Sequence, residues 1–216
     1  MVKVIASVLN ADFSKKKEWL PQLNESEIDG IQWDIMDNKY VPNTGIEKQL
    51  IGELRPQTKL FFESHLMVVD PENYLEEMAE LGTQLLIFHI ETTNNPKNII
   101  KEINDFGMSA GIAINNKTPA EKIFPHLDKV DLSLVMSVEA GFGGQKFNPL
   151  ALEKISLLRK KIDEEAIACE IEVDGGIKFE TAKECVKAGA DILVSGTGIF
   201  KHQKGIKEAI KEMKEL

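Results

Sequence analysis

Short runs of strand-forming residues recur along the whole chain, and helical patterns separate them. The runs cover residues 2–9, 30–37, 60–67, 85–92, 109–115, 132–138, 169–175 and 191–197. Strands that alternate with helices are typical of parallel βα units. Eight such units, each about 25–30 residues long, favour a (β/α)8 TIM barrel at the small end of its size range.

A doubly wound open sheet is the rival architecture. Such a sheet usually has fewer strands, and a GxGxxG turn follows its first strand, which is not the case here. The 216 residues would suffice for one large domain or two small ones. No linker, low-complexity segment or block of charge divides the chain. We therefore expect a single barrel domain over residues 1–216.

Three segments between the runs have the pattern of helices, covering residues 70–82, 148–162 and 182–189. Asp70 and Pro71 predict the start of the first, with Asp70 as its N-cap, and Gly82 predicts its end. Asn148 and Pro149 predict the start of the second in the same way.

Composition excludes several classes of function. The net charge of -9 argues against a general nucleic-acid binder, although an anionic substrate stays possible. No apolar run reaches the ~18 residues that span a bilayer, and the first residues are too polar for a signal peptide. Cys169 and Cys185 form no CxxC pair, which fits a reducing compartment. We expect a cytoplasmic protein that binds neither nucleic acid nor membrane.

Polar residues two positions apart interrupt four of the predicted strands. Side chains at such spacing point to the same face of a strand. We expect all of them near the carboxyl ends of the strands, where a TIM barrel carries its active site. A structural hydrogen-bond network is the alternative for any single pair. The pairs are Gln32/Asp34, Glu63/His65, His89/Glu91 and Glu172/Asp174.

Three of these residues could bind a divalent metal ion. Asp34, His65 and Asp174 come from the second, third and seventh predicted strands, and two carboxylates with one imidazole are a suitable ligand set. Three methionines lie near the same height in the barrel as these ligands. They could form an apolar cushion against the carbon atoms of a substrate. They are Met36, Met67 and Met136.

Glycine-rich turns follow the last three predicted strands, at residues 141–145, 174–177 and 195–198. Any one of them could be an ordinary turn. Three at the same end of a barrel indicate a phosphate site, because glycines let backbone N–H groups approach an anion. The turns contain no lysine or arginine, so amides and the Thr197 hydroxyl would hold the phosphate.

Seven segments together resemble the ribulose-phosphate 3-epimerase family over nearly the whole chain. They are SVLNADF (7–13), WDIMDNKYVPN (33–43), HLMVVDP (65–71), FHIE (88–91), LVMSVEAGFGGQKF (134–147), IEVDGGI (171–177) and AGADILVSGTGIF (188–200). The resemblance implies a ribulose-phosphate binding (β/α)8 barrel that interconverts D-ribulose 5-phosphate and D-xylulose 5-phosphate. It also implies one divalent metal ion, which could be zinc, iron, manganese or magnesium.

The resemblance assigns roles to single residues. Asp34 and Asp174 match the two acid/base residues, and with His65 they match three metal ligands. Gln32 stands where the family places a fourth ligand, usually histidine. Positions that match contacts to the substrate or its phosphate are Ser7, His65, Gly141, Phe142, Gly143, Gly144, Gly175, Gly176, Gly196 and Thr197.

The chain also departs from the family pattern near the expected site. Asn38 replaces a glycine, Glu63 replaces an aspartate, and Ala140 and Asn116 replace prolines. Two other functions therefore stay open: epimerisation of another ketose phosphate, such as allulose 6-phosphate, and phosphosugar binding with reduced or no catalysis because of Gln32. Related barrels form dimers or hexamers, so we expect a homo-oligomer.

Overall fold

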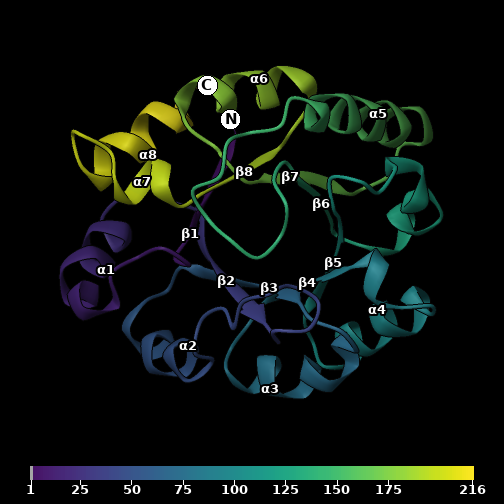
Figure 1. Cartoon of the computed structure of the whole chain (residues 1–216), viewed down its shortest axis with the longest axis horizontal. Coiled ribbons are helices and arrows are strands. Elements are labelled where there is room, and N and C mark those ends of the chain that lie inside the picture. The colour runs from purple at the N-terminus through teal and green to yellow at the C-terminus, as the bar shows by residue number, and fades with distance from the viewer. Residues whose placement is uncertain (1) are drawn as a thin grey trace.

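The strands form one closed, parallel barrel in the computed structural model, which describes residues 2–216. Neighbours in the barrel follow chain order, and the last strand pairs with the first (Figure 1). This closure confirms the TIM barrel and excludes the open sheet. The strands are β1 (Lys3–Ser7), β2 (Gly30–Met36), β3 (Phe61–Met67), β4 (Leu85–His89), β5 (Ser109–Ile114), β6 (Leu132–Met136), β7 (Glu170–Asp174) and β8 (Ile192–Ser195).

Helices surround the barrel as an outer ring, as Figure 1 shows. Between β5 and β6 the described chain has only 3-10 turns, at Ala120–Lys122 and Phe124–Lys129. A short extra helix, α7, precedes the last one. The helices are α1 (Lys16–Asn24), α2 (Gln49–Leu54), α3 (Leu75–Glu80), α4 (Pro96–Asp105), α5 (Leu150–Glu165), α6 (Phe179–Ala188), α7 (Thr197–Phe200) and α8 (Ile206–Lys214).

Each observed strand lies within its predicted run and is shorter than it, and at β4 the difference affects a residue of a predicted polar pair. Strand β4 ends at His89, and Ile90–Thr92 form a 3-10 turn, so Glu91 lies outside the strand. The Glu91 carboxylate accepts a hydrogen bond from the backbone N–H of Asn115 at 2.9 Å. This contact joins the turn to the end of β5 and draws Glu91 away from a strand position.

The helical segment after β3 begins at Pro71 with Asp70 in the N-cap position, as predicted, but the cap and the first turn differ from the prediction. Asp70 has φ 51°, in the left-handed region that aspartate tolerates, and its side chain caps nothing. A 3-10 turn over Pro71–Tyr74 comes first, and α3 follows. Gly82 has φ 86° and ends the segment as predicted.

Two apolar clusters fill the molecule. The larger lies between the strands and the helices and includes the fully buried Trp33, Phe62 and Phe88. The smaller consists of inward-facing strand residues and a few loop residues. It contains all three methionines of the predicted cushion, which are Met36, Met67 and Met136.

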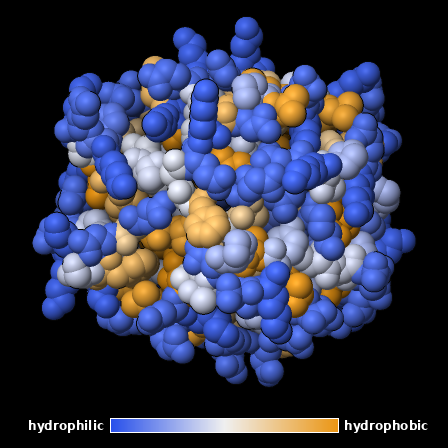
Figure 2. All heavy atoms as spheres, in the orientation of Figure 1, coloured by the Kyte–Doolittle hydropathy of each residue, from blue (hydrophilic) through white to orange (hydrophobic). Residues whose placement is uncertain are grey.

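The face at the barrel mouth is mostly hydrophilic, with hydrophobic groups near its centre and toward the lower left of the view (Figure 2). Phe142, in the loop after β6, is about half exposed. Within residues 2–216, every helix is too short or too polar to cross a bilayer.

Candidate active site

Inward-facing polar residues form two layers in the barrel, which corrects the prediction of a single layer at its mouth. The strand register places Asp34 opposite His65 and, one pleat below, Gln32 opposite Glu63. On β7, Asp174 lies in the upper layer, opposite Met136 of β6, and Glu172 lies below it. Glu63 and Glu172 are in the middle of their strands rather than near the carboxyl ends.

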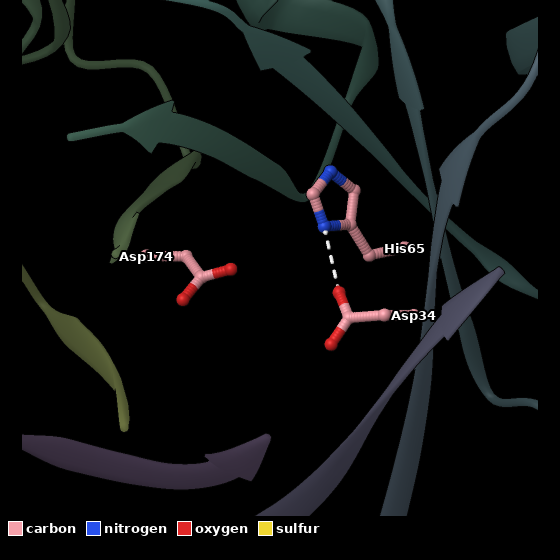
Figure 3. Close-up of side chains that lie close together, drawn as sticks. All are labelled: Asp34, His65 and Asp174. Atoms are coloured by element: carbon pink, nitrogen blue, oxygen red, sulfur yellow. Dashed lines mark hydrogen bonds and ion pairs between the residues drawn. The ribbon is translucent and has the colours of Figure 1, made fainter. Parts of the chain in front are cut away.

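The upper layer brings together the three predicted metal ligands. One ligand atom from each of Asp34, His65 and Asp174 lies within 4.8 Å of the other two. Figure 3 shows Asp34 and His65 on neighbouring strands, facing Asp174 across the barrel. The Ser7 hydroxyl, from β1, donates a hydrogen bond of 2.9 Å to Asp34 Oδ2 and fixes that carboxylate from the other side.

Gln32 links the two aspartates from the layer below. Its Nε2 lies 3.2 Å from Asp34 Oδ1 and 3.2 Å from Asp174 Oδ2, and donates to both. Its Oε1 is buried without a hydrogen-bond partner. An orphaned buried acceptor of this kind costs free energy and calls for an explanation.

A chain of hydrogen bonds runs from His65 toward the loop after β4. His65 Nε2 lies 2.9 Å from His89 Nε2, and His89 Nδ1 lies 3.2 Å from Glu91 Oε2. Burial lowers the pKa of His89 to about 4. Burial raises the pKa of Glu91, but hydrogen bonds from His89, Thr118 and the Asn115 amide outweigh it and lower that pKa to about 2. At neutral pH, His89 is therefore neutral and Glu91 is ionised.

This series of hydrogen bonds determines which nitrogen of His65 carries a proton. The ionised Glu91 can only accept, so His89 donates from Nδ1 and its Nε2 is an acceptor. His65 must then donate from Nε2, and in its neutral form it presents the bare Nδ1 to Asp34 Oδ1 at 3.2 Å. Two lone pairs that converge in this way suit a cation between them.

The spacing of these atoms also fits a divalent cation. Two atoms that each lie about 2.1 Å from one ion are about 3.0–3.4 Å apart. The separation of 3.2 Å between His65 Nδ1 and Asp34 Oδ1 falls in this interval. His65 and Asp34 are therefore spaced as two ligands of one ion, and Asp174, with a ligand atom within 4.8 Å of both, completes the candidate set.

Four carboxyl groups share the barrel interior, and the pKa values of three of them are raised. Burial, followed by the charge of Asp34, raises the pKa of Asp174 to about 6. Burial and the charges of Asp174 and Asp34 raise the pKa of Glu63 to about 8. Burial and the charge of Glu63 raise the pKa of Glu172 well above its ordinary value. The lower-layer carboxyls thus favour their neutral forms near pH 7.

The predicted phosphate-binding residues line one cavity above the upper layer. His65 and Gln32 do not line it, since both are fully buried. The 195–198 segment is not a simple turn, because Gly196 leads directly into α7. Predicted residues in the lining are Ser7, Asp34, Gly141, Phe142, Gly143, Gly144, Asp174, Gly175, Gly176, Gly196 and Thr197.

Asn10 also lines this cavity, although the sequence analysis assigned it no role. A side chain at Gly143 would place its Cβ 2.0 Å from Asn10 Nδ2, so the glycine lets the loop pack against this residue. Asn10 lies just beyond the end of β1, inside the SVLNADF segment. Its position after a barrel strand was the signal that could have identified it.

The loop after β6 crosses the barrel mouth (Figure 1). Asn43 Nδ2, from the loop after β2, donates to the Gly141 carbonyl at 2.6 Å. Within the loop itself, Gln145 Nε2 donates to the carbonyls of Glu139 and Phe142, each at 2.7 Å. These bonds hold the first glycine-rich turn over the paired aspartates.

Comparison with known proteins agrees with this geometry. A model of the ribulose-phosphate 3 epimerase family matches residues 3–200. The ribulose-phosphate 3-epimerase of Schizosaccharomyces pombe is 36% identical over 215 residues, covering 98% of this chain and 92% of that protein. The ribulose-phosphate 3-epimerase of Methanocaldococcus jannaschii is 38% identical over 215 residues, covering 100% of this chain and 91% of the relative.

A solved structure supports the fold separately. The crystal structure of KGPDC from Streptococcus mutans superimposes with a TM-score of 0.76 at 15% sequence identity. The match covers 99% of this chain and 96% of the other.

Proposed function

Because the chain belongs to the ribulose-phosphate 3-epimerase family, we propose that it interconverts D-ribulose 5-phosphate and D-xylulose 5-phosphate by inverting carbon 3. The observation that carries the proposal is the placement of Asp34 and Asp174 on strands β2 and β7, facing each other below one cavity. A full-length relationship to named epimerases supports the same reaction.

The two carboxyl groups would act as the acid and the base. The C3 proton is acidic because the adjacent C2 ketone can delocalise the electron pair that the proton leaves behind. One carboxylate removes this proton, and the opposite carboxylic acid delivers another to the other face of C3. The raised pKa of Asp174, about 6, helps it to hold a proton near neutral pH.

After one turnover the proton has moved from one aspartate to the other. Without metal, Gln32 Nε2 donates to both carboxyls. The Ser7 hydroxyl holds the second oxygen of Asp34 and is independent of that bridge. The Ser7 contact would keep Asp34 oriented toward the substrate while the protonation states exchange.

Asp34, His65 and Asp174 would hold one divalent metal ion, with Gln32 as a weaker fourth ligand. When bound, such an ion polarises the C2 ketone and stabilises the negative charge that develops on its oxygen. A carboxamide oxygen is a harder ligand than imidazole, so this set favours manganese or magnesium more than a site with a second histidine would. Met67 and Met136, which line the cavity, would pack against the carbon chain of the sugar, whereas Met36 is not in its lining.

Backbone amides of the three glycine-rich segments and the Thr197 hydroxyl would bind the phosphate. Gly176 has a structural need for glycine, since a Cβ there would lie 2.5 Å from the Phe147 amide nitrogen. Gly144 and Gly196 are less crowded, with nearest contacts of 3.7 Å and 3.1 Å. The φ of 78° already favours glycine at 144, and the Ser7 carbonyl partly restricts a side chain at 196. Phosphate binding would be a further reason for both glycines.

A substrate panel on protein of measured metal content tests this proposal. We expect fast epimerisation of ribulose 5-phosphate, slower epimerisation of allulose 6-phosphate, and poor turnover of free ribulose. Faster turnover of the hexulose phosphate would reassign the substrate. Tight binding of ribulose 5-phosphate without turnover would identify a phosphosugar-binding protein instead.

We further propose a cytoplasmic homo-oligomer. Cys169 and Cys185 are buried free thiols, as expected for a reducing compartment. Light scattering during size-exclusion chromatography would give the oligomeric state, and a monomeric mass would contradict this part of the proposal.

A further inference from the structure

Two unpaired oxygen atoms lie in the lower layer of the barrel, on neighbouring strands. Gln32 Oε1 and Glu63 Oε1 are both buried and have no hydrogen-bond partner. The two residues are register partners on β2 and β3, and both side chains point inward. Adjacent strands are about 4.8 Å apart, so these side chains are direct neighbours. Gln32 Oε1 can only accept, and Glu63 Oε1 receives no hydrogen bond from Gln32 in this arrangement.

A half-turn of the Gln32 carboxamide changes this arrangement. The turn exchanges the positions of Oε1 and Nε2, which are nearly equal in size. Oε1 then lies about 3.2 Å from Asp34 Oδ1 and from Asp174 Oδ2, where Nε2 lies now. Three such oxygens repel one another unless a cation lies among them, and 3.2 Å is a normal separation for two ligands of one ion.

We propose that Glu63 is a positioning residue for the fourth metal ligand: with metal bound, Gln32 turns its Oε1 to the ion and donates from Nε2 to Glu63. The inference rests on the metal site proposed above. It assigns a partner to each of the two orphaned oxygens. It also gives the ligand a supporting hydrogen bond of the kind that orients metal ligands and makes their oxygen atoms more basic.

Register selects Glu63 rather than the other lower-layer carboxyl. Glu172 is also fully buried, and both of its carboxyl oxygens are unpaired. However, its strand pairs with β6 and β8, where it lies opposite Leu134 and Ile192. Glu63 also retains an accepting oxygen whether its carboxyl is ionised or neutral. The proposed contact therefore needs no particular protonation state.

Metal affinity, measured with Mn²⁺ alone against a competing chelator, tests the proposal. Glu63→Met removes the acceptor while nearly keeping the volume, and we expect the Kd to rise about 10- to 100-fold. Glu63→Gln keeps an acceptor, so its Kd for Mn²⁺ should stay within about threefold of the Kd of the parent. Glu172→Met removes an equally buried carboxyl that is not a register partner of Gln32. Because it also removes an ionisable neighbour of Glu63, its Kd should rise, but clearly less than that of Glu63→Met.

Repeating the Glu63 substitution in a protein without Gln32 tests whether Glu63 acts through Gln32. In Gln32→Ala protein, Glu63→Met should change the Kd no further. An equal loss in both backgrounds, or an equal loss in Glu172→Met, would overturn the positioning role. Asp34→Asn separates this failure from that of the metal site. If the parent binds no Mn²⁺, or Asp34→Asn binds it equally well, the proposed metal site itself is wrong.

Nuclear magnetic resonance on the unaltered protein gives a readout that does not depend on the stability of any variant. Addition of Zn²⁺ should shift the Gln32 side-chain amide signals and produce a nuclear Overhauser effect between these protons and the Glu63 Hγ protons. The signals are identified by their loss in Gln32→Met. Unchanged Gln32 amide signals on zinc saturation would refute the turn.

Discussion

Replacing Glu63 by glutamine should stabilise the metal-free protein above pH 4.5, and most at alkaline pH. Burial and the neighbouring aspartates raise the pKa of Glu63 from 4.5 to about 8. The folded state therefore binds this proton more tightly than the unfolded chain does. The stability that the protonated group contributes is complete below pH 4.5 and is lost as the pH rises toward 8.

The size of the loss follows from the same two pKa values. Between them the free energy of unfolding falls by about 1.4 kcal/mol for each pH unit, or roughly 5 kcal/mol in total. Glutamine cannot ionise and avoids this loss. Removing one carboxyl also eases the ionisation of Glu172, which is coupled to Glu63 through its charge. We expect Glu63→Gln to gain several kcal/mol at pH 9 and close to nothing at pH 4.5.

Urea unfolding in the presence of a chelator measures this difference. With an m-value of about 2–3 kcal/mol/M, the midpoint of Glu63→Gln should lie about 1–2 M above that of the parent at pH 9. The two midpoints should nearly coincide at pH 4.5. Glu91→Gln is the opposite control, since the low pKa of Glu91 means that its ionised form stabilises the fold, and this variant should be less stable than the parent at pH 9. A gain for Glu63→Gln that is equal at both pH values would refute the electrostatic reasoning.

Three further predictions concern the active site. Asp34→Asn and Asp174→Asn should each lower kcat by at least ~100-fold, because each removes a proton-transfer group; near-normal turnover in either would exclude the two-carboxylate reaction. Thr197→Val should raise the KM for ribulose 5-phosphate roughly 10- to 100-fold, since a hydrogen bond to a charged group is lost; an unchanged KM would remove Thr197 from the phosphate site. Glu91→Gln should release the fixed tautomer of His65, which imidazole ¹⁵N shifts of the metal-free protein would report; an unchanged tautomer would break the proposed hydrogen-bond chain.

The regular spacing of the strand-forming runs was sufficient to predict the barrel, because buried parallel strands require apolar runs. The alternation of side chains along each strand also indicated that Asp34, His65 and Asp174 face inward. The structure brings these three residues together. The resemblance located Gln32 beside them. Regular spacing, side-chain alternation and short motifs can all be recognised in a single sequence.

The depth of each polar residue was not predictable, because it depends on the stagger between strands. Spacing along β2 alone puts Gln32 one pleat below Asp34, but only the register places Glu63 level with Gln32, and nothing in either strand alone reveals that pairing. The contact between His65 and His89 joins two strands in the same way. Asp70 was misread because aspartate before proline has two common uses, as a helix cap and as a left-handed turn residue.

Exchange of the C3 proton with solvent tests the central claim most directly. Ribulose 5-phosphate is incubated with metal-quantified protein in D2O, and the products are followed by proton NMR. We predict that xylulose 5-phosphate forms with deuterium at C3, because one aspartate removes the substrate proton and the other delivers a proton from the solvent pool. Product that retains the original hydrogen at C3, or the absence of both exchange and product, would contradict the account.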